Sequence, residues 1–291
     1  MVVTTGFFDG VHLGHRQVIE SLVRLARERE TESTVVTFWP HPRTVLQNDA
    51  RNFRLLSTLE EKRTMLLAAG VDRVEVLHFT REFAALSAEE YLRKYVIGQF
   101  GGEALVLGYD NRMGSSADGV TDVGEIAAGL GLEVVRTEPV IMAGTTISST
   151  KIREALASGD VTSASEMLGY DFSLKGVVVA GNRIGHTIGF PTANMQLYEP
   201  LKMVPANGVY MTEVMVQGGR YRGITNIGIR PTLGRDNLPV IETHILDFDE
   251  EIYGLDISLS FVRKIRDEIR FDSLDSLRSQ LQKDRQVWCS I

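Results

Sequence analysis

The sequence predicts two domains of different fold class: an α/β domain with a parallel sheet, followed by a small antiparallel β-barrel or sandwich that ends in a helix. Up to about Tyr170, β-branched runs alternate with segments of helical periodicity, the pattern of a parallel sheet covered by helices. Over 175–262, short apolar runs are separated by glycine-rich turns, which is typical of a small closed β structure. We therefore expect one domain over 1–169 and a second over 170–291.

The first half carries ten expected elements, and unusual stretches follow several of its strands. We expect strands at 2–5, 33–39, 71–79, 104–107 and 132–137, and helices at 16–30, 57–69, from 87, 122–130 and from 147. Thr58 and Glu61 have capping-box spacing. Ligands of parallel sheets bind beyond the carboxyl ends of the strands. Because 6–15, 108–114 and the segment before 147 each follow a strand, we expect them to converge on one crevice.

The second half is expected to be almost entirely strands. They are predicted at 176–180, 208–216, 221–227, 240–248 and 257–261. Gly218 and Gly219 predict a hairpin turn. The final helix is expected from about Ser273, with Leu274, Leu277 and Leu281 on one face.

Length and composition limit the possible functions. A chain of 291 residues can bury two cores, and its 43% hydrophobic and 24% charged residues are ordinary for a soluble protein. The net charge of −7 argues against a nucleic-acid-binding surface. One cysteine, Cys289, excludes an internal disulfide, so we expect a cytoplasmic protein. We expect neither a membrane span nor a signal peptide. The chain opens in a strand, compatible with a missing short leader, and no feature indicates an oligomeric state.

Gly6–His15 reads Gly-Phe-Phe-Asp-Gly-Val-His-Leu-Gly-His and joins the first strand to the first helix. Such a turn directs backbone N–H groups and the positive end of a helix dipole at its ligand, and phosphate is the natural occupant. Gly10 and Gly14 would let a ligand approach the backbone closely. His12 and His15 could both donate to one phosphate. Two histidines on an exposed turn favour function over core packing.

A second candidate anion site begins the helix at Ile147–Arg153. Ser148 or Ser149 is at least its N-cap. Lys151 and Arg153 place positive charge near the start of the helix, where the dipole disfavours it. That placement is reasonable if an anion binds there.

Together with Thr-Phe-Trp-Pro-His-Pro-Arg at 37–43, these motifs resemble the adenylyltransferase half of bifunctional bacterial riboflavin kinase/FAD synthetases. The resemblance implies a Rossmann-like nucleotidyltransferase domain. In it the His-x-Gly-His turn holds the ATP phosphates, and the Ser-Ser-Thr-x-x-Arg segment closes over them. It implies that His12 and His15 are catalytic and that Mg²⁺ shares the phosphate charge. The implied ATP-binding residues are Gly6, Phe8, Asp9, Gly10, His12, Gly14, His15, Ser148, Ser149, Thr150 and Arg153.

One segment departs from this family. Residues 108–114 read Gly-Tyr-Asp-Asn-Arg-Met-Gly, where the family has Gly-x-Asp/Asn-Phe-x-Phe-Gly. The resemblance makes Asp110 a flavin-binding residue of the adenylyltransferase. Asn111 and Met113 replace the two phenylalanines, so a chain with only kinase activity is an alternative.

Gly181–Asn194 reads Gly-Asn-Arg-Ile-Gly-His-Thr-Ile-Gly-Phe-Pro-Thr-Ala-Asn and resembles the riboflavin kinase signature. By itself it is a glycine-rich loop with a proline corner that presents a hydroxyl and an amide. Thr192 and Asn194 can act as oxygen ligands near Mg²⁺ and ATP phosphates. His186 stands where the family generally has arginine. The implied ATP- and Mg²⁺-binding residues of this half are Gly181, Gly185, Thr192 and Asn194.

Further runs at 205–210, 226–232 and 242–248 resemble kinase segments. The likeness implies that Glu242 takes the proton from the ribityl 5′-hydroxyl. From the residues alone, a carboxylate at a strand start is equally a solvated edge charge. Residues 263–271 resemble the flap before the last helix, which implies that Arg266 contacts the flavin or closes the site. A solvated charge run is the alternative.

Our hypothesis is a Mg²⁺-dependent cytoplasmic enzyme that phosphorylates riboflavin to FMN and adenylylates FMN to FAD, with ATP in both steps. One alternative is a kinase with an impaired adenylyltransferase site. Another is a flavin-binding regulator without turnover. A tRNA-directed enzyme is a third, because His-x-Gly-His turns also occur in class I aminoacyl-tRNA synthetases; the acidic balance argues against it.

Overall fold

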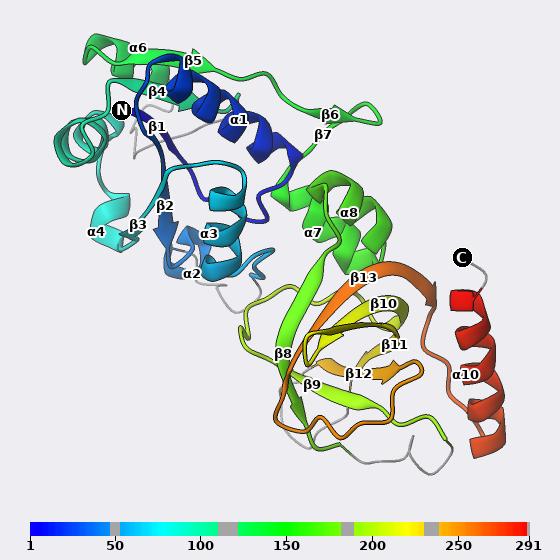
Figure 1. The fold of residues 1–291 in the computed structure, drawn as a ribbon. Coiled ribbons are helices and arrows are strands. Elements are labelled where there is room, and N and C mark those ends of the chain that lie inside the picture. Colours follow the sequence, from blue (N-terminus) through cyan, green and yellow to red (C-terminus); the bar gives the residue numbers. More distant parts are fainter. Residues whose placement is uncertain (47–52, 110–121, 182–188, 230–238, 290–291) are drawn as a thin grey trace. The chain divides into compact units, whose positions relative to one another are not determined.

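The chain forms two compact units, Met1–Ser149 and Thr150–Ile291, in the computed structural model. The structure describes residues 1–46, 53–109, 122–181, 189–229 and 239–289. The first unit is a sheet covered by helices, and the second is a barrel accompanied by helices (Figure 1). The predicted fold class is therefore confirmed. The domain boundary predicted between 169 and 170 stays a prediction.

The sheet of the first unit has five parallel strands in the order β3-β2-β1-β4-β5. They are β1 (Val2–Thr5), β2 (Ser33–Trp39), β3 (Arg73–His78), β4 (Ala104–Leu107) and β5 (Glu133–Arg136). Thr4 of β1 pairs with Val35 on one side and Val106 on the other. The strand order changes direction between β1 and β4, and doubly wound sheets bind ligands at such a switch point. The segment Gly6–His15, called the histidine turn below, starts directly after β1.

Helices cover both faces of this sheet. They are α1 (Leu13–Glu28), α2 (Pro42–Leu46), α3 (Leu59–Ala68), α4 (Arg81–Ala84), α5 (Ala88–Tyr91), the π-helix η2 (Leu92–Gln99) and α6 (Val123–Gly129); a short hairpin, β6 (Ile141–Met142) and β7 (Thr145–Thr146), follows β5. Val2 packs in one core with Ile19 of α1, and Val3 packs in the other with Leu92. Successive strand residues point to opposite faces, so β1 is buried on both sides.

Side-chain caps set where two of these helices begin. The capping box of α3 is confirmed, with Glu61 N donating to Thr58 Oγ1 (3.1 Å) and Thr58 N donating to Glu61 Oε2 (2.9 Å). Helix α1 begins at Leu13, three residues earlier than predicted, because His12 is its N-cap and accepts a hydrogen bond from His15 N. His15 therefore lies in the first turn of the helix.

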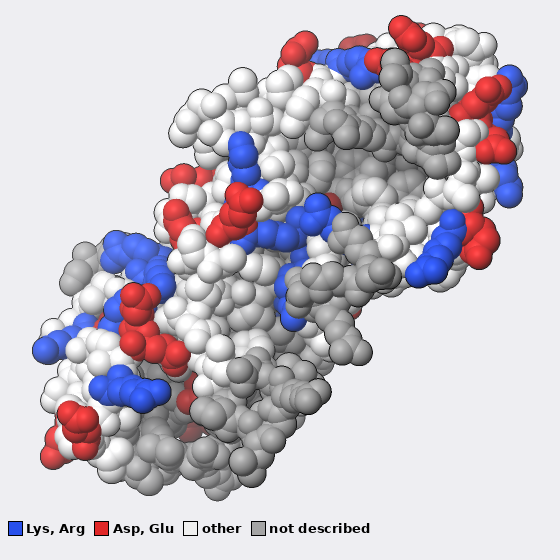
Figure 2. Space-filling model, turned by 180° about the vertical axis from the view of Figure 1, so that it is seen from behind, with Lys and Arg blue, Asp and Glu red and all other residues white. Residues whose placement is uncertain are grey.

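The surface carries charges of both signs. In Figure 2, acidic and basic side chains lie beside each other in several separate groups on the visible face. Within the described ranges, no helix has both the length and the hydropathy needed to cross a membrane.

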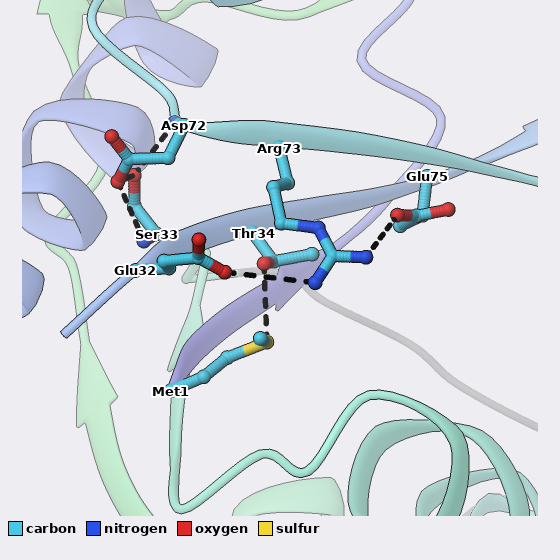
Figure 3. Close-up of polar contacts among 7 residues, drawn as sticks. All are labelled: Met1, Glu32, Ser33, Thr34, Asp72, Arg73 and Glu75. Atoms are coloured by element: carbon cyan, nitrogen blue, oxygen red, sulfur yellow. Dashed lines mark hydrogen bonds and ion pairs between the residues drawn. The ribbon is translucent and has the colours of Figure 1, made fainter.

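A polar network joins the starts of β2 and β3 (Figure 3). The Asp72 carboxylate accepts hydrogen bonds from Ser33 N (2.8 Å) and Ser33 Oγ (2.6 Å), which lower the pKa of Asp72. Arg73 lies between two carboxylates, 3.6 Å from Glu32 and 2.8 Å from Glu75. This network lies at the amino ends of the strands, whereas the histidine turn follows a carboxyl end. Its role is to fix the sheet rather than to form the candidate site.

The second unit contains a closed antiparallel barrel in the order β10-β11-β12-β9-β8-β13, which confirms the barrel rather than the sandwich. Its strands are β8 (Ser173–Val179), β9 (Ala193–Leu197), β10 (Gly208–Val216), β11 (Gly219–Ile229), β12 (Pro239–Ile245) and β13 (Asp256–Arg266), and its helices are α7 (Ser149–Ser158), α8 (Val161–Leu168) and α10 (Leu274–Cys289). Strand β9 was not predicted, because it begins inside the motif at 181–194.

The barrel interior combines apolar side chains with a buried row of hydroxyls. Tyr210 and Phe261 are fully buried with their rings in edge contact. Thr212 Oγ1 lies 2.8 Å from Thr225 Oγ1, which lies 2.9 Å from Thr243 Oγ1. Each threonine hydroxyl can donate one bond and accept another, so this row is satisfied internally. The neighbours of these threonines along β11 and β12 must then face outward.

The C-terminal part of helix α10 packs against the barrel. Trp288 Nε1 donates to Gly223 O (2.7 Å), and the Trp288 ring packs with Val209 and Met211. Leu274, at the start of the predicted apolar face, is 54% exposed. The leucine spacing predicted the helix, but the main apolar anchor is the tryptophan.

A buried ion pair also fixes this helix, and breaking it should destabilise the barrel. Arg266 donates to Asp284 from Nε (3.1 Å) and Nη2 (2.8 Å), and their side chains are only 15% and 1% exposed. Asp284→Ala leaves an unpaired buried guanidinium, a loss of about 3 kcal/mol or more in the free energy of unfolding. Calorimetry of the full chain should show a lower transition temperature for the barrel.

The same helix offers a matched control. Arg285 pairs with Asp247 at the surface, where the two side chains are 46% and 82% exposed. Exposed ion pairs contribute little, so Arg285→Ala should leave the transition unchanged. Equal transition temperatures for the two variants would show that the Arg266–Asp284 pair does not stabilise the barrel.

Candidate functional site

Three of the four residues from Phe8 to Val11, in the histidine turn between β1 and α1, have positive backbone φ. Phe8 (φ 46°), Gly10 (φ 83°) and Val11 (φ 38°) all have positive φ. Two of them carry side chains that disfavour this region, and both of these side chains are buried, Phe8 at 4% and Val11 at 1% exposure. Such backbone persists only where its surroundings hold it, and it is concentrated at functional sites.

The two histidines lie against each other at the start of α1. Their rings stack with centroids 3.6 Å apart and planes 15° apart. A Cβ on Gly14 would lie 3.2 Å from the His12 ring, so glycine makes room for this imidazole. The edge of the Phe8 ring contacts His15, with centroids 5.2 Å apart. The first turn of the helix thus presents two packed imidazoles at a helix N-terminus, a position that favours a bound anion.

The environment of His15 keeps its ring neutral. Burial lowers the pKa of His15 well below 6.5, and the positive charges of His12 and Lys62 lower this pKa further. The Nδ1 atom is buried and has no hydrogen-bond partner among the residues that the structure describes. A neutral imidazole has one N–H donor and one acceptor. His15 can therefore offer one hydrogen bond to a phosphate without carrying charge.

A buried carboxylate supports the turn from below. Asp9 is 3% exposed, and its Oδ1 accepts from Leu56 N and Ser57 N, both at 3.0 Å. Gly10 N donates to Ser57 Oγ (2.9 Å). These bonds attach the turn to residues 56 and 57, a connection that sequence reasoning missed. Asp9 thus has a supporting contact, and its expected contact with ATP stays a prediction.

Ser149, the last residue of the first unit and the first residue of α7, contacts the same turn. Ser149 Oγ donates to the carbonyl oxygen of Asp9 at 3.0 Å, and Ser148 directly precedes the helix, in the cap position. The start of α7 therefore contacts the 6–15 turn, whereas the expected convergence of 6–15, 108–114 and the segment before 147 on one crevice stays a prediction. Thr150 and Arg153 follow along α7, and their contacts with ATP stay predictions. Asp110, Asn111 and Met113 lie outside the described residues.

A second polar group crosses three strands of the barrel. Glu242 on β12 pairs with Asn194 on β9 and with Asn226 on β11. Directly paired residues share one face of a sheet, so these three side chains lie side by side, opposite the buried threonines. A Cβ on Gly181 would lie 2.1 Å from Asn194 Nδ2, so glycine leaves space for this amide. Sequence reasoning missed Asn226, because only the register brings it beside Glu242.

A histidine fixes the proline corner that carries Thr192. His244 Nδ1 lies 2.8 Å from Pro191 O, and its ring makes an edge contact with Phe190 at 5.1 Å between centroids. A carbonyl oxygen only accepts, so Nδ1 carries the proton. Burial lowers the pKa of His244, so the ring remains neutral at pH 7. Sequence reasoning missed His244, although its position two residues after Glu242 places both on one face.

The remaining predicted kinase residues are less informative. Arg266 lies at the end of β13 with its guanidinium paired to Asp284, so it has a structural partner on α10. Its expected contact with the flavin stays a prediction. Gly185 and His186 lie outside the described residues.

Comparisons with known proteins cover both units. A family model described as FAD synthetase matches residues 1–151, and one described as riboflavin kinase matches residues 168–291. A bifunctional riboflavin kinase/FMN adenylyltransferase from Listeria monocytogenes is 37% identical over 98% of this chain and 90% of its own length. The Bacillus subtilis protein of the same description gives the same identity and shares. A crystal structure described as a macrolide-efflux protein from Streptococcus pneumoniae superposes with a TM-score of 0.91 at 33% identity, covering 98% of this chain and 92% of that one.

Proposed function

This chain belongs to the family of bifunctional riboflavin kinases/FMN adenylyltransferases, and we propose that each activity resides in the unit that its family model matches. The second unit phosphorylates riboflavin with ATP to give FMN. The first unit transfers AMP from a second ATP to FMN, giving FAD and pyrophosphate. The observation that carries the assignment is the stacked His12–His15 pair at a helix N-terminus, on the switch point of a parallel sheet.

Adenylyl transfer at this turn requires placement rather than covalent catalysis. A phosphate oxygen of FMN attacks the α-phosphorus of ATP, and pyrophosphate leaves on the opposite side. Fixed donors aimed at the developing charge lower the barrier without reorganising during the reaction. The N–H groups of α1, His12 and His15 are such donors. Thr150 and Arg153 are proposed to add donors at the leaving pyrophosphate.

The side chains of Asn194, Glu242 and Asn226, which lie beside one another on the barrel, include the groups that phosphorylation of a hydroxyl needs. The riboflavin 5′-hydroxyl attacks the γ-phosphorus of ATP and loses its proton, the bond from this phosphorus to the bridging oxygen breaks, and ADP leaves. Glu242 is the base that we propose to receive the proton. Asn194 and Asn226 flank Glu242 in the strand register. They can position the carboxylate and the hydroxyl on one face of the barrel.

We propose that Thr192 and Asn194 hold Mg²⁺ at the kinase site. Their hydroxyl and amide oxygens, with the carboxylate of Glu242 nearby, are the oxygen donors that Mg²⁺ prefers. Among the described residues no group of three or more His, Cys, Asp or Glu could hold a metal. Mg²⁺ at phosphoryl-transfer sites is commonly held by one or two protein side chains together with the phosphates of the nucleotide. Bound Mg²⁺ neutralises charge on the phosphates during transfer.

Location and partners follow from the same proposal. Riboflavin, FMN, FAD and ATP are the small molecules that the activities need. We propose that the protein acts in the cytoplasm without nucleic acid or membrane. The single cysteine and the net charge of −7 support this.

One time course tests the proposed function. The full chain is incubated with riboflavin, ATP and Mg²⁺, and the flavins are separated by chromatography at intervals. We expect FMN to rise first and then to be replaced by FAD. FMN alone would contradict the adenylyltransferase and implicate Asn111 and Met113; no product at all would favour a flavin-binding regulator.

A further inference from the structure

A lysine is buried beneath the histidine turn. Lys62 lies one turn into α3, on the face that packs against the sheet, and it is only 3% exposed. Lysine is almost never fully buried unless its charge has a partner. Nothing in the motifs identifies this residue, since its neighbours in sequence, Glu61 and Arg63, are ordinary helix-surface charges.

A line of hydrogen bonds leads from this lysine to the turn. Lys62 Nζ donates to Thr37 Oγ1 on β2 at 3.4 Å. Thr37 Oγ1 in turn donates to the carbonyl oxygen of Phe7 at 3.3 Å. Phe7 is the second residue of the histidine turn. The Lys62 ammonium is therefore connected to the start of this turn through the Thr37 hydroxyl.

The charge of Lys62 is only partly matched by its surroundings. The neighbouring carboxylate is Asp9, whose oxygens already accept from Leu56 N, Ser57 N and Ser57 Oγ. Burial lowers the pKa of Lys62 to about 8, although the Asp9 charge acts in the opposite direction. The positive charge of Lys62 in turn lowers the pKa of His15 on α1. On β3, which α3 also contacts, Arg73 and Glu75 pair with each other.

A purely structural role explains this arrangement poorly. If Lys62 only filled space between α3 and the sheet, an apolar residue would do so without desolvating a charge. The ammonium lies instead behind a turn built to receive phosphates. A triphosphate bound at the turn would add negative charge to that of Asp9 near the Lys62 ammonium.

We propose that Lys62 is a positioning residue of the adenylyltransferase site: its buried ammonium holds Phe7 through Thr37 and supplies positive charge, from beneath the turn, to the triphosphate that the turn binds. The inference rests on the proposed adenylyltransferase function. Lysine is charged below its pKa, so the support is complete at neutral pH. It is lost as the pH rises through about 8.

The test compares Lys62→Met and Lys62→Arg with Lys94→Met, a control at an exposed lysine whose ammonium lies over the Tyr95 ring. With FMN supplied, KM for ATP in FAD formation is measured between about pH 6.5 and 9.5. We expect Lys62→Met to raise this KM by about tenfold at neutral pH, the size expected for one charge acting across a partly desolvated site. FMN formation from riboflavin, and the melting temperature, should not fall.

The fall of kcat/KM for ATP at alkaline pH distinguishes a role of the Lys62 charge from a role of its packing. In the wild type, kcat/KM for ATP should fall above about pH 8. Lys62→Met should lack this fall because the charge is already absent, and Lys62→Arg should lack it because the guanidinium stays protonated. If Lys62→Met does not fold, Lys62→Arg decides: an alkaline fall identical to that of the wild type overturns the inference.

Proton uptake gives a readout that needs no turnover. Titration calorimetry of ATP binding near pH 8, in two buffers of different ionisation heat, should show more proton uptake by the wild type than by Lys62→Met. Equal uptake, or an unchanged KM for ATP in Lys62→Met, overturns the inference. A wild type that makes FMN but no FAD instead contradicts the proposed adenylyltransferase itself, so the two failures are distinguishable.

Discussion

His15→Ala is expected to lower the rate of FAD formation from FMN by about 10²–10³-fold, the loss typical when one preorganised donor is removed from developing charge. The stacked pair would lose one imidazole, and the first turn of α1 would lose the ring that packs on Phe8. Phosphorylation of riboflavin should continue, because His15 is not part of the proposed kinase site on the barrel. Chromatography with FMN or with riboflavin as substrate measures the two rates separately.

A second histidine provides the control for this substitution. His78 ends β3 and is exposed, so His78→Ala should retain both activities. In the wild type, burial and the charges of His12 and Lys62 lower the pKa of His15 well below 6.5. Its neutral form therefore persists through neutral pH and is lost only as the pH falls through that lowered value. Loss of FAD formation already between about pH 7 and 6.5 would contradict this assignment.

The turn was predictable from sequence because its signal is local. Three glycines and two histidines between a strand and a helix specify a phosphate-type turn wherever the rest of the chain lies. The start of α1 was wrong by three residues, since imidazole is an uncommon N-cap and Gly14 disfavours helix. Lys62 was missed because helical periodicity alone does not show that a lysine position is covered by tertiary packing.

The barrel site was predictable only in part, since it depends on long-range register. Asn194 and Glu242 could be identified from motifs, but their contact with Asn226 arises from the pairing of three strands. The same limit applies to Asp284. The leucine spacing of α10 predicts a helix, whereas the buried pair with Arg266 depends on where β13 ends. The roles of such residues can be recognised only in the folded barrel, because their contacts join segments that lie far apart in the sequence.

Glu242→Ala should have the opposite effect to His15→Ala. Removing a general base typically costs about 10²–10⁴-fold in rate, so FMN formation from riboflavin should nearly cease while supplied FMN is still converted to FAD. Glu242→Gln preserves the size of the side chain and its place between Asn194 and Asn226. A loss in Glu242→Gln similar to that in Glu242→Ala therefore indicates proton transfer rather than packing.

Glu213 supplies the matched control for this carboxylate. It lies on β10 of the same barrel, where it pairs with Arg220 at the surface, so Glu213→Gln should leave FMN formation unchanged. The comparison also tests whether the two units act independently. If Glu242→Ala abolished both activities while His15→Ala did the same, one shared site would have to perform both transfers. Opposite losses in the two variants require two nucleotide sites, one at the histidine turn and one on the outer face of the barrel.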